Sequence, residues 1–197
     1  MNENKAEIIG FLCAEGCYVN TFRIFHELDK RRGSIYLRFK HRRVIEFSNY
    51  NIKILKRFAH LIYREYRFQP KLIKNNERYA KVILCRLNVI EDLLKYSDYG
   101  SLKWSIPKEM FFKEASIKYA FLSGFIDGDG SVDDRRIRIY SANFNGLLQI
   151  SEILKSLNIY HTLQGPIKIN KKHDMFAIYI NKKVSRKMLK NLRLNKI

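Results

Sequence analysis

Apolar and polar side chains alternate along two short segments of the chain, residues 35–40 and 136–140. In an extended strand this alternation places isoleucine, leucine or phenylalanine on one face and mainly arginine, lysine or tyrosine on the other. Strands of this kind are typical of antiparallel sheets that helices cover on one side. The pattern therefore predicts one such strand in each half of the chain.

Helical periodicity follows each of these strands, over residues 52–66 and 147–157, after asparagines that are good helix N-caps. A second strand pair and a closing helix come next in each half. The strands are expected over residues 71–74, 79–85, 160–169 and 176–180, and the closing helices over 89–94 and 184–189. Since each half also begins with a helix, we predict an α+β fold made of two αββαββα halves.

The repeats divide the chain into residues 1–97 and residues 114–197. Between them, residues 98–113 contain Gly100 and Pro107 and show no sustained period, so this segment is interpreted as a linker. The first repeat is longer than the second between its first two helices. We therefore expect extended or additional strands around residues 26–34.

The chain is strongly basic, with 38 lysines and arginines against 19 acidic residues and a net charge of +19. This excess favours a nucleic acid partner, and the absence of a long basic amphipathic helix makes an anionic membrane surface the weaker alternative. Three cysteines without zinc-ligand spacing fit a reducing compartment. No signal peptide or membrane-spanning run is recognisable, so we expect an intracellular protein, in a prokaryotic cytoplasm or an organelle.

Two similar segments, IIGFLCAEG at residues 8–16 and LSGFIDGDG at residues 122–130, carry the chemistry. Glycine inside a helix costs roughly 1 kcal/mol relative to alanine, so its placement in both segments needs a reason. Small residues at i and i+4 (Gly10 and Ala14, Gly124 and Gly128) would let two helix backbones approach closely. Packing there would place Glu15 beside Asp129, which suggests a metal site for cutting a polyanion.

These segments resemble the paired signature helices of the LAGLIDADG homing endonucleases in their single-chain, two-motif form. The second copy matches the motif almost position for position; its matching residues are Leu122, Gly124, Asp127, Asp129 and Gly130. The first copy is more degenerate and keeps Gly10, Ala14, Glu15 and Gly16, with Cys13 where the second has Asp127. Asp127 is therefore interpreted as helix-terminal structure and not as a ligand.

The resemblance implies an enzyme and a mode of DNA binding. The signature helices would pack at the interface of the halves, and the two sheets would form a saddle over double-stranded DNA. A monomer, encoded within an intron, would cut both strands of a long asymmetric target across the minor groove and leave 3′ overhangs. Mg²⁺ would be held by the carboxylates of Glu15 and Asp129 and the carbonyls of Ala14 and Gly128. Mn²⁺ would substitute, and Ca²⁺ would support binding without cleavage.

Accessory catalytic residues are expected at Asn49 and Asn143, which we align with each other, and at Lys183. Helix capping by the asparagines and phosphate contact by the lysine are equally open alternatives. The polar faces of the strands predict the residues that contact DNA: Arg38, Lys40, Arg42, Arg136, Arg138 and Lys168. A different function on the same fold, an RNA-splicing maturase that binds intron RNA or a non-cleaving regulator, is the alternative. The presence of both acids favours the nuclease.

Overall fold

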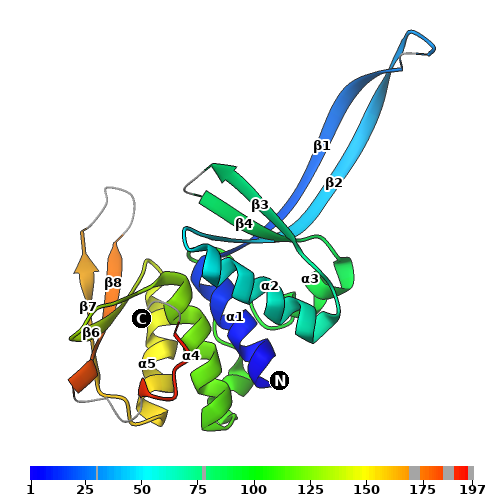
Figure 1. The fold of residues 1–197 in the computed structure, drawn as a ribbon. Coiled ribbons are helices and arrows are strands. Elements are labelled where there is room, and N and C mark those ends of the chain that lie inside the picture. The colour runs from blue at the N-terminus through cyan, green and yellow to red at the C-terminus, as the bar shows by residue number, and fades with distance from the viewer. Residues whose placement is uncertain (30, 77–78, 169–173, 184–188, 195–197) are drawn as a thin grey trace.

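The computed structural model describes the chain except residues 30, 77–78, 169–173, 184–188 and 195–197 (Figure 1). The first half contains α1 (Glu3–Glu15), β1 (Gly16–Asp29), β2 (Ser34–Asn49), α2 (Ile52–Tyr66), β3 (Lys71–Asn76), β4 (Tyr79–Leu84) and α3 (Leu87–Leu94). The second half contains α4 (Ala115–Asp129), β5 (Gly130–Val132), β6 (Arg136–Ser141), α5 (Phe144–Ser156), β7 (His161–Ile167) and β8 (Met175–Asn181). A short 3-10 helix, η1 (Lys108–Phe112), precedes α4. The closing helix expected over residues 184–189 falls almost entirely outside the described residues.

Both halves use the same sheet topology. The strand orders are β1-β2-β4-β3 and β5-β6-β8-β7, and all neighbouring strands are antiparallel. This equivalence confirms the predicted α+β fold with a repeated order of helices and strands. No helix among the described residues has the length and apolar character needed to cross a bilayer.

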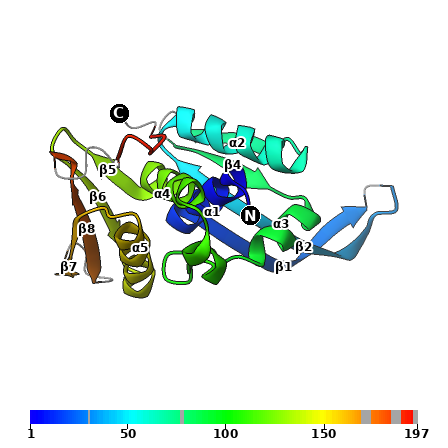
Figure 2. The same ribbon diagram turned by 90° about the horizontal axis from the view of Figure 1, so that it is seen from below.

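Helices α1 and α4 run side by side through the centre of the molecule, with one sheet on each side of the pair (Figures 1 and 2). Every residue from Lys5 to Cys13 in α1 is buried, and so is every residue from Lys118 to Gly128 in α4. A helix that is buried on all sides must be enclosed by other elements. The two segments of the sequence motif thus form the centre of the fold.

Aromatic side chains fix the outer elements to this central pair. Phe11 of α1, Phe47 of β2 and Phe58 of α2 form a cluster with ring centroids 4.6 to 5.9 Å apart. In the second half, Trp104 from the segment between the halves packs on Phe125 of α4 at 5.0 Å. Such pairs add about 1 kcal/mol each beyond the area they bury. The connecting segment is therefore part of the second half's core.

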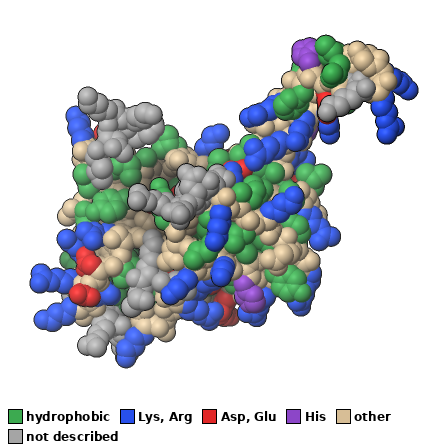
Figure 3. All heavy atoms as spheres, turned by 45° about the horizontal axis from the view of Figure 1, so that its top comes forward, with side chains coloured by type: hydrophobic (Ala, Val, Ile, Leu, Met, Phe, Trp, Pro, Cys, Tyr) green, Lys and Arg blue, Asp and Glu red, His purple; other side chains and the backbone are tan. Residues whose placement is uncertain are grey.

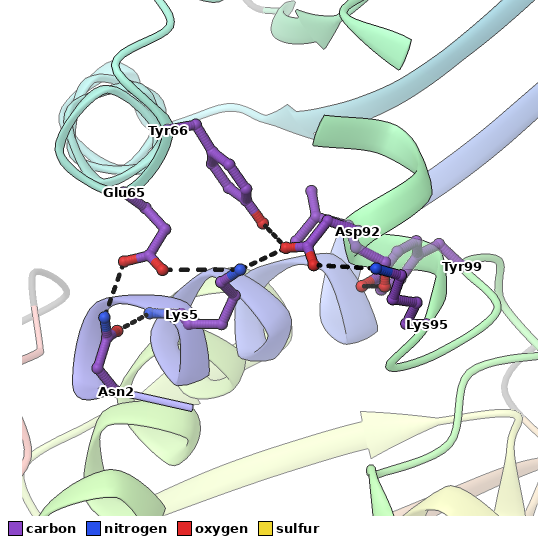
Figure 4. A network of polar contacts seen from close by, with 8 residues as sticks. Asn2, Lys5, Glu65, Tyr66, Asp92, Lys95 and Tyr99 are labelled. Atoms are coloured by element: carbon purple, nitrogen blue, oxygen red, sulfur yellow. Dashed lines mark hydrogen bonds and ion pairs between the residues drawn. The ribbon is translucent and has the colours of Figure 1, made fainter. Parts of the chain in front are cut away.

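A buried lysine ties the start of α1 to its neighbours (Figure 4). Lys5 pairs with Asp92 of α3 and lies 3.6 Å from Glu65 of α2, with its ammonium 4.5 Å from the centre of the Tyr66 ring. The Tyr66 hydroxyl donates to Asp92 at 2.8 Å. Desolvation by burial raises the pKa of Asp92, but hydrogen bonds from Lys5 and Tyr66 outweigh it, so that the pKa is lower than usual. This network joins three helices of the first half.

The strand-to-helix junctions of the two halves align differently from our expectation. Asn51 caps α2 and Asn143 caps α5, each accepting from a backbone N–H of the first helical turn. The backbone N–H of Asn51 donates to the Asn49 side chain at 2.8 Å, and that of Asn143 donates to the Ser141 hydroxyl at 3.1 Å. The counterpart of Asn143 is therefore Asn51, and Asn49 corresponds to Ser141. Sequence reasoning misaligned them by two residues because both junctions contain two asparagines in an Asn-x-Asn pattern.

Strands β1 and β2 pair over their whole length, but only Ile45–Asn49 of β2 also pairs with β4. The outer parts, residues 20–29 and 34–43, form a two-stranded arm that projects from the body (Figure 1). The expected strand extension is thus confirmed. The alternation over residues 35–40 is also present, yet its apolar face reaches no core, since Ile35 and Phe39 are 68% and 60% exposed.

Candidate active site at the paired helix ends

Gly10 and Gly124 lie where the backbones of α1 and α4 touch. A Cβ atom at Gly10 would collide with the Phe121 carbonyl oxygen and lie 3.0 Å from the Phe125 nitrogen. A Cβ atom at Gly124 would collide with the Glu7 carbonyl oxygen and lie 3.0 Å from the Phe11 nitrogen. The expected close approach of the two glycine-bearing helices is confirmed. We call this contact the glycine seam.

The seam continues to the C-terminal ends of both helices. A Cβ atom added to Gly128 would lie 2.5 Å from the Cβ of Ala14. Glu15 and Asp129 follow these two residues directly and are the last residues of α1 and α4. Glu15 is exposed and Asp129 is half-buried. Two carboxylates therefore leave neighbouring helix ends, where the last carbonyl groups have no partner within the helix.

The glycines that end the two motifs have a local function. The backbone N–H of Gly16 donates to the Leu12 carbonyl, and that of Gly130 donates to the Ile126 carbonyl. A Cβ atom would come within 2.7 Å of the Leu12 Cα in the first case and within 2.6 Å of the Ile126 oxygen in the second. Glycine thus lets the chain turn directly from helix into strand, which holds the preceding carboxylate at the helix end.

Asn49 links the first half to the second at this point. Its side-chain amide donates to the carbonyl oxygen of Gly128 at 3.2 Å, and its side-chain oxygen accepts from Asn51. Asn143 is placed differently: its amide nitrogen donates to the Trp104 carbonyl and its oxygen accepts from the backbone of Gly146 at 3.0 Å. Asn49 therefore contacts the expected site, whereas these contacts fit the capping alternative for Asn143.

The structure places Lys183 beyond the end of β8. Gly130, next to Asp129, pairs with Ile139, and Ile139 pairs with Ile178 of β8. Lys183 lies two residues beyond the end of β8, where the chain turns helical, and its backbone N–H donates to the Asn181 side chain at 2.9 Å. It lines a surface hollow of about 620 Å³ with Asp134 and Arg135, at the far end of β5.

Lys81 is a basic residue of the first sheet that sequence reasoning missed. It lies on β4 opposite Ser48, and its ammonium is 2.9 Å from Glu46 of β2. Glu46 in turn pairs with Cys17, two residues after Glu15. The side chain of Lys81 is only 19% exposed and lies on the same face of the sheet as Glu46. A lone polar residue in the apolar segment YAKVIL of β4 is the signal that could have identified it.

Cys13 and Asp127, which occupy matching positions in the two motifs, are both buried below the helix ends. Burial raises the pKa of the Cys13 thiol to about 12, so the group is a neutral thiol. Asp127 has no exposed surface and lies 3.7 Å from the Arg57 guanidinium, which also pairs with Glu7 at 2.6 Å. Desolvation by burial raises the pKa of Glu7, and Arg57 opposes this shift. These contacts agree with a structural role for Asp127.

The outer face of the second sheet is concave, basic and aromatic. A hollow of about 420 Å³ there is lined by residues of β6, β7 and β8 and by Tyr160 just before β7: Arg136, Arg138, Tyr140, Tyr160, Thr162, Gln164, Tyr179 and Asn181. Arg136 stacks 5.8 Å from the Tyr179 ring, and Arg138 pairs with Asp133 at 3.1 Å. The predicted alternation is confirmed, because Ile137 and Ile139 face the core.

The other predicted contact residues lie on the arm and near the end of β7. Arg38 and Lys40 are exposed on one face of the arm, where Arg38 pairs with Glu27 at 2.9 Å. Arg42 follows on the same face and pairs with Glu46. Lys168 is exposed just after β7. Lysine and arginine side chains are spread over this view of the body and along the arm (Figure 3).

Comparisons with known proteins agree with this architecture. Residues 116–193 match the LAGLIDADG-like domain family. A curated relative, an A-type ATP synthase subunit from Pyrococcus abyssi (strain GE5 / Orsay), is 24% identical over 175 residues. The match covers 85% of this chain, which spans only 15% of the length of that relative.

Solved structures match almost the whole chain. The homing endonuclease I-DmoI in complex with DNA and Mn superposes with a TM-score of 0.68 at 14% identity, covering 96% of each chain. The I-LtrWI LAGLIDADG homing endonuclease bound to target DNA gives 0.60 at 12% identity, covering 98% of this chain and 85% of that one. DUF199/WhiA from Thermatoga maritima gives 0.61 at 17% identity, covering 98% and 56%. The fold of the LAGLIDADG homing endonucleases is thereby confirmed for this chain, and the second motif's family is matched in sequence as well.

Proposed function

We propose that this chain is a site-specific endonuclease that binds double-stranded DNA and cuts both strands with a divalent metal ion. The observation that carries the proposal is the convergence of two helix ends at Ala14 and Gly128, each followed by a carboxylate. Solved structures of the same fold contain target DNA together with Mn, Mg or Ca, which supports both the partner and the metal class.

The donor groups at the helix ends fit a hard cation. Glu15 and Asp129 would supply carboxylate oxygens, and the carbonyls of Ala14 and Gly128 would add neutral ones. The Gly128 carbonyl accepts from Asn49, but a carbonyl oxygen has a second lone pair. Within the described part of the chain, no group of three or more His, Cys, Asp or Glu side chains is gathered. This favours Mg²⁺, which retains water and uses few protein ligands.

A metal held there would lower the pKa of a bound water and stabilise negative charge on the phosphate. The chain's own groups would orient this chemistry. Asn49 would fix the position of the Gly128 carbonyl from the opposite half, and Lys81 would stabilise charge beside Glu15. One carboxylate would serve each DNA strand, and the cut would fall across the minor groove and leave 3′ overhangs, as the family resemblance implies. The intron origin of the gene belongs to the same proposal.

The basic surfaces would position the DNA. The hollow around Arg136 and Arg138 and the polar face of the arm with Arg38 and Lys40 offer guanidinium and ammonium groups for phosphates and base edges. If the protein contacts about six phosphates, raising the salt concentration from 50 to 200 mM would weaken its affinity for DNA roughly 10³-fold. A net charge of +19 is consistent with binding that depends on phosphate contacts.

The test begins by selecting bound duplexes from a randomised library in Ca²⁺, and then measures cleavage of the selected site in Mg²⁺. Wild-type protein should cut both strands, whereas Asp129→Asn and Glu15→Gln should each lose cleavage and keep DNA affinity. Glu109→Gln, an exposed carboxylate on η1, is the matched control and should cut normally. Full cutting by both active-site variants would overturn the proposal. Specific binding without cleavage by the wild type would instead favour the maturase or regulator.

A further inference from the structure

One face of the arm is apolar over its outer part, beyond the pair of Asn20 and Arg43 at its base. Residues on it come from alternate positions of the paired strands, in the order Phe22 with His41, Ile24 with Phe39, His26 with Leu37, and Leu28 with Ile35. Six of these eight side chains are large and apolar, and their exposed fractions run from 53% to 68%: Phe22, Ile24, Leu28, Ile35, Leu37 and Phe39. The face contains no lysine, arginine, aspartate or glutamate over these eight positions.

The opposite face of the arm carries the basic and aromatic side chains expected of a surface that binds nucleic acid. It carries Arg23 opposite Lys40, Phe25 opposite Arg38 and Glu27 opposite Tyr36. At the base of the arm this face continues into Glu46 and Lys81. The apolar face continues past Arg43, which pairs with Glu91, into Ile45 and Phe47, which are fully buried. The helices thus cover the apolar face in the body and leave it exposed beyond. Figure 3 shows hydrophobic side chains at the far end of the arm.

The exposed area is large enough for a stable interface. At roughly 100 Å² for each of six side chains, the face offers about 600 Å², the upper end of what a monomer usually leaves exposed. Packing it against an identical face would bury about 1,200 Å² in total, which reaches the range of specific protein interfaces. An uncharged face fits a copy of itself without leaving a charge unpaired, and it offers no cation to a phosphate backbone.

We propose that the apolar face of the arm is a dimer interface, on which the same face of a second copy of this chain packs as a two-layer β-sandwich. The arm projects from the body, so two bodies can lie apart while their arms are in contact (Figure 1). Each arm keeps its basic face open toward DNA. This dimer departs from the monomer that the family resemblance implies, and it is independent of DNA cleavage.

Sedimentation equilibrium on the full-length protein without DNA tests the interface. The mass should rise from one chain to two over concentrations around 10 µM, a typical affinity for an interface at the lower size limit. The double variant Ile24→Ser/Phe39→Ser, which removes a cross-strand pair on the apolar face, should remain a single chain. Phe25→Ser/Tyr36→Ser removes two aromatic side chains from the opposite face and should dimerise as the wild type does.

Salt dependence separates this association from nucleic acid binding. Because each copy carries a net charge of +19, added salt should screen repulsion and strengthen the dimer, whereas DNA binding weakens with salt. A wild-type mass of one chain at about 100 µM, or an unchanged dimer in the Ile24→Ser/Phe39→Ser variant, would overturn the proposal. So would a loss of duplex affinity in that variant at concentrations where the wild type is monomeric, which would assign the face to DNA.

Discussion

The two halves of the molecule share a strand order but differ strongly in their first hairpin. In the first half, β1 and β2 have 14 and 16 residues and extend far beyond the sheet; in the second half, β5 and β6 have 3 and 6. The halves differ along their inner strands too, since β4 carries Lys81 opposite Ser48, whereas the corresponding position of β8, opposite Tyr140, is Ala177. Only the helix pair is nearly symmetric. The difference indicates that the seam fixes the fold and that the outer strands are free to specialise.

The largest loss of stability should come from disrupting the contact between α1 and α4, the symmetric part of the molecule. Gly10→Leu and Gly124→Leu would each force a side chain into the backbone of the opposite helix, at a cost of at least about 3 kcal/mol in the free energy of unfolding. Urea unfolding measures this loss. Lys56→Ala on the exposed face of α2 is the control and should change stability by less than about 0.5 kcal/mol. If either glycine variant were as stable as this control, the seam would not hold the halves together.

The next largest effect, on the cleavage rate, should show that the lysines of the two halves are not equivalent. Lys81→Met should slow cleavage by about 10²-fold, because β4 would lose its one basic side chain, while Lys183→Met should change the rate little. Single-turnover cleavage of the selected duplex measures both rates. Equal losses in the two variants would return Lys183 to the active site.

A smaller effect on stability should distinguish the buried lysines near the starts of α1 and α4. Lys5 near the start of α1 pairs with Asp92, whereas Lys118 in the first turns of α4 donates to the neutral Ser156 hydroxyl at 3.1 Å. Lys5→Met should cost about 2 kcal/mol, less than a fully buried pair would, because the side chain of Asp92 is 28% exposed. Lys118→Met should cost less, and urea unfolding at neutral pH compares the two.

The same network sets a pH dependence. Because the pKa of Asp92 is lowered in the folded protein, its contribution to stability is present above its ordinary pKa of 3.8 and is lost as the pH falls through the folded value. Unfolding measured from pH 6 down to about pH 3 should therefore show a steeper loss for wild type than for Asp92→Asn. Parallel curves would mean that the pair contributes nothing.

The smallest effects concern the helix caps at the two junctions. Asn51→Ala should cost about 1 kcal/mol, and Asn143→Ala somewhat more because its buried amide also bonds to Trp104. Thermal unfolding measures both. Both variants should cut DNA normally once folded, unlike Asn49→Ala, which removes the hydrogen bond to Gly128. A catalytic defect in folded Asn143→Ala would restore the role first expected for it.

The fold and the paired acids could be predicted because they depend on local patterns that a single sequence displays. The interior glycines of both motifs cost helix stability, so close packing was the natural explanation, and strand alternation revealed the polar faces. The sequence could not show which of Lys81 and Lys183 belongs to the site, because the position of each relative to the acids depends on the pairing register between strands. The exposed face of the arm was equally hidden, since alternation defines two faces of a strand but does not tell whether anything covers them.

The glycine seam is built from main-chain atoms, which are the same in every protein. Provided that glycine stays at the two contact positions, almost any other residue can change by mutation without altering the surfaces that meet there. Two chains can therefore share only about one residue in seven, as this chain and I-DmoI do at 14% identity, and still have one architecture. The outer strands and their surfaces can change under these conditions while the packing of the two central helices stays constant.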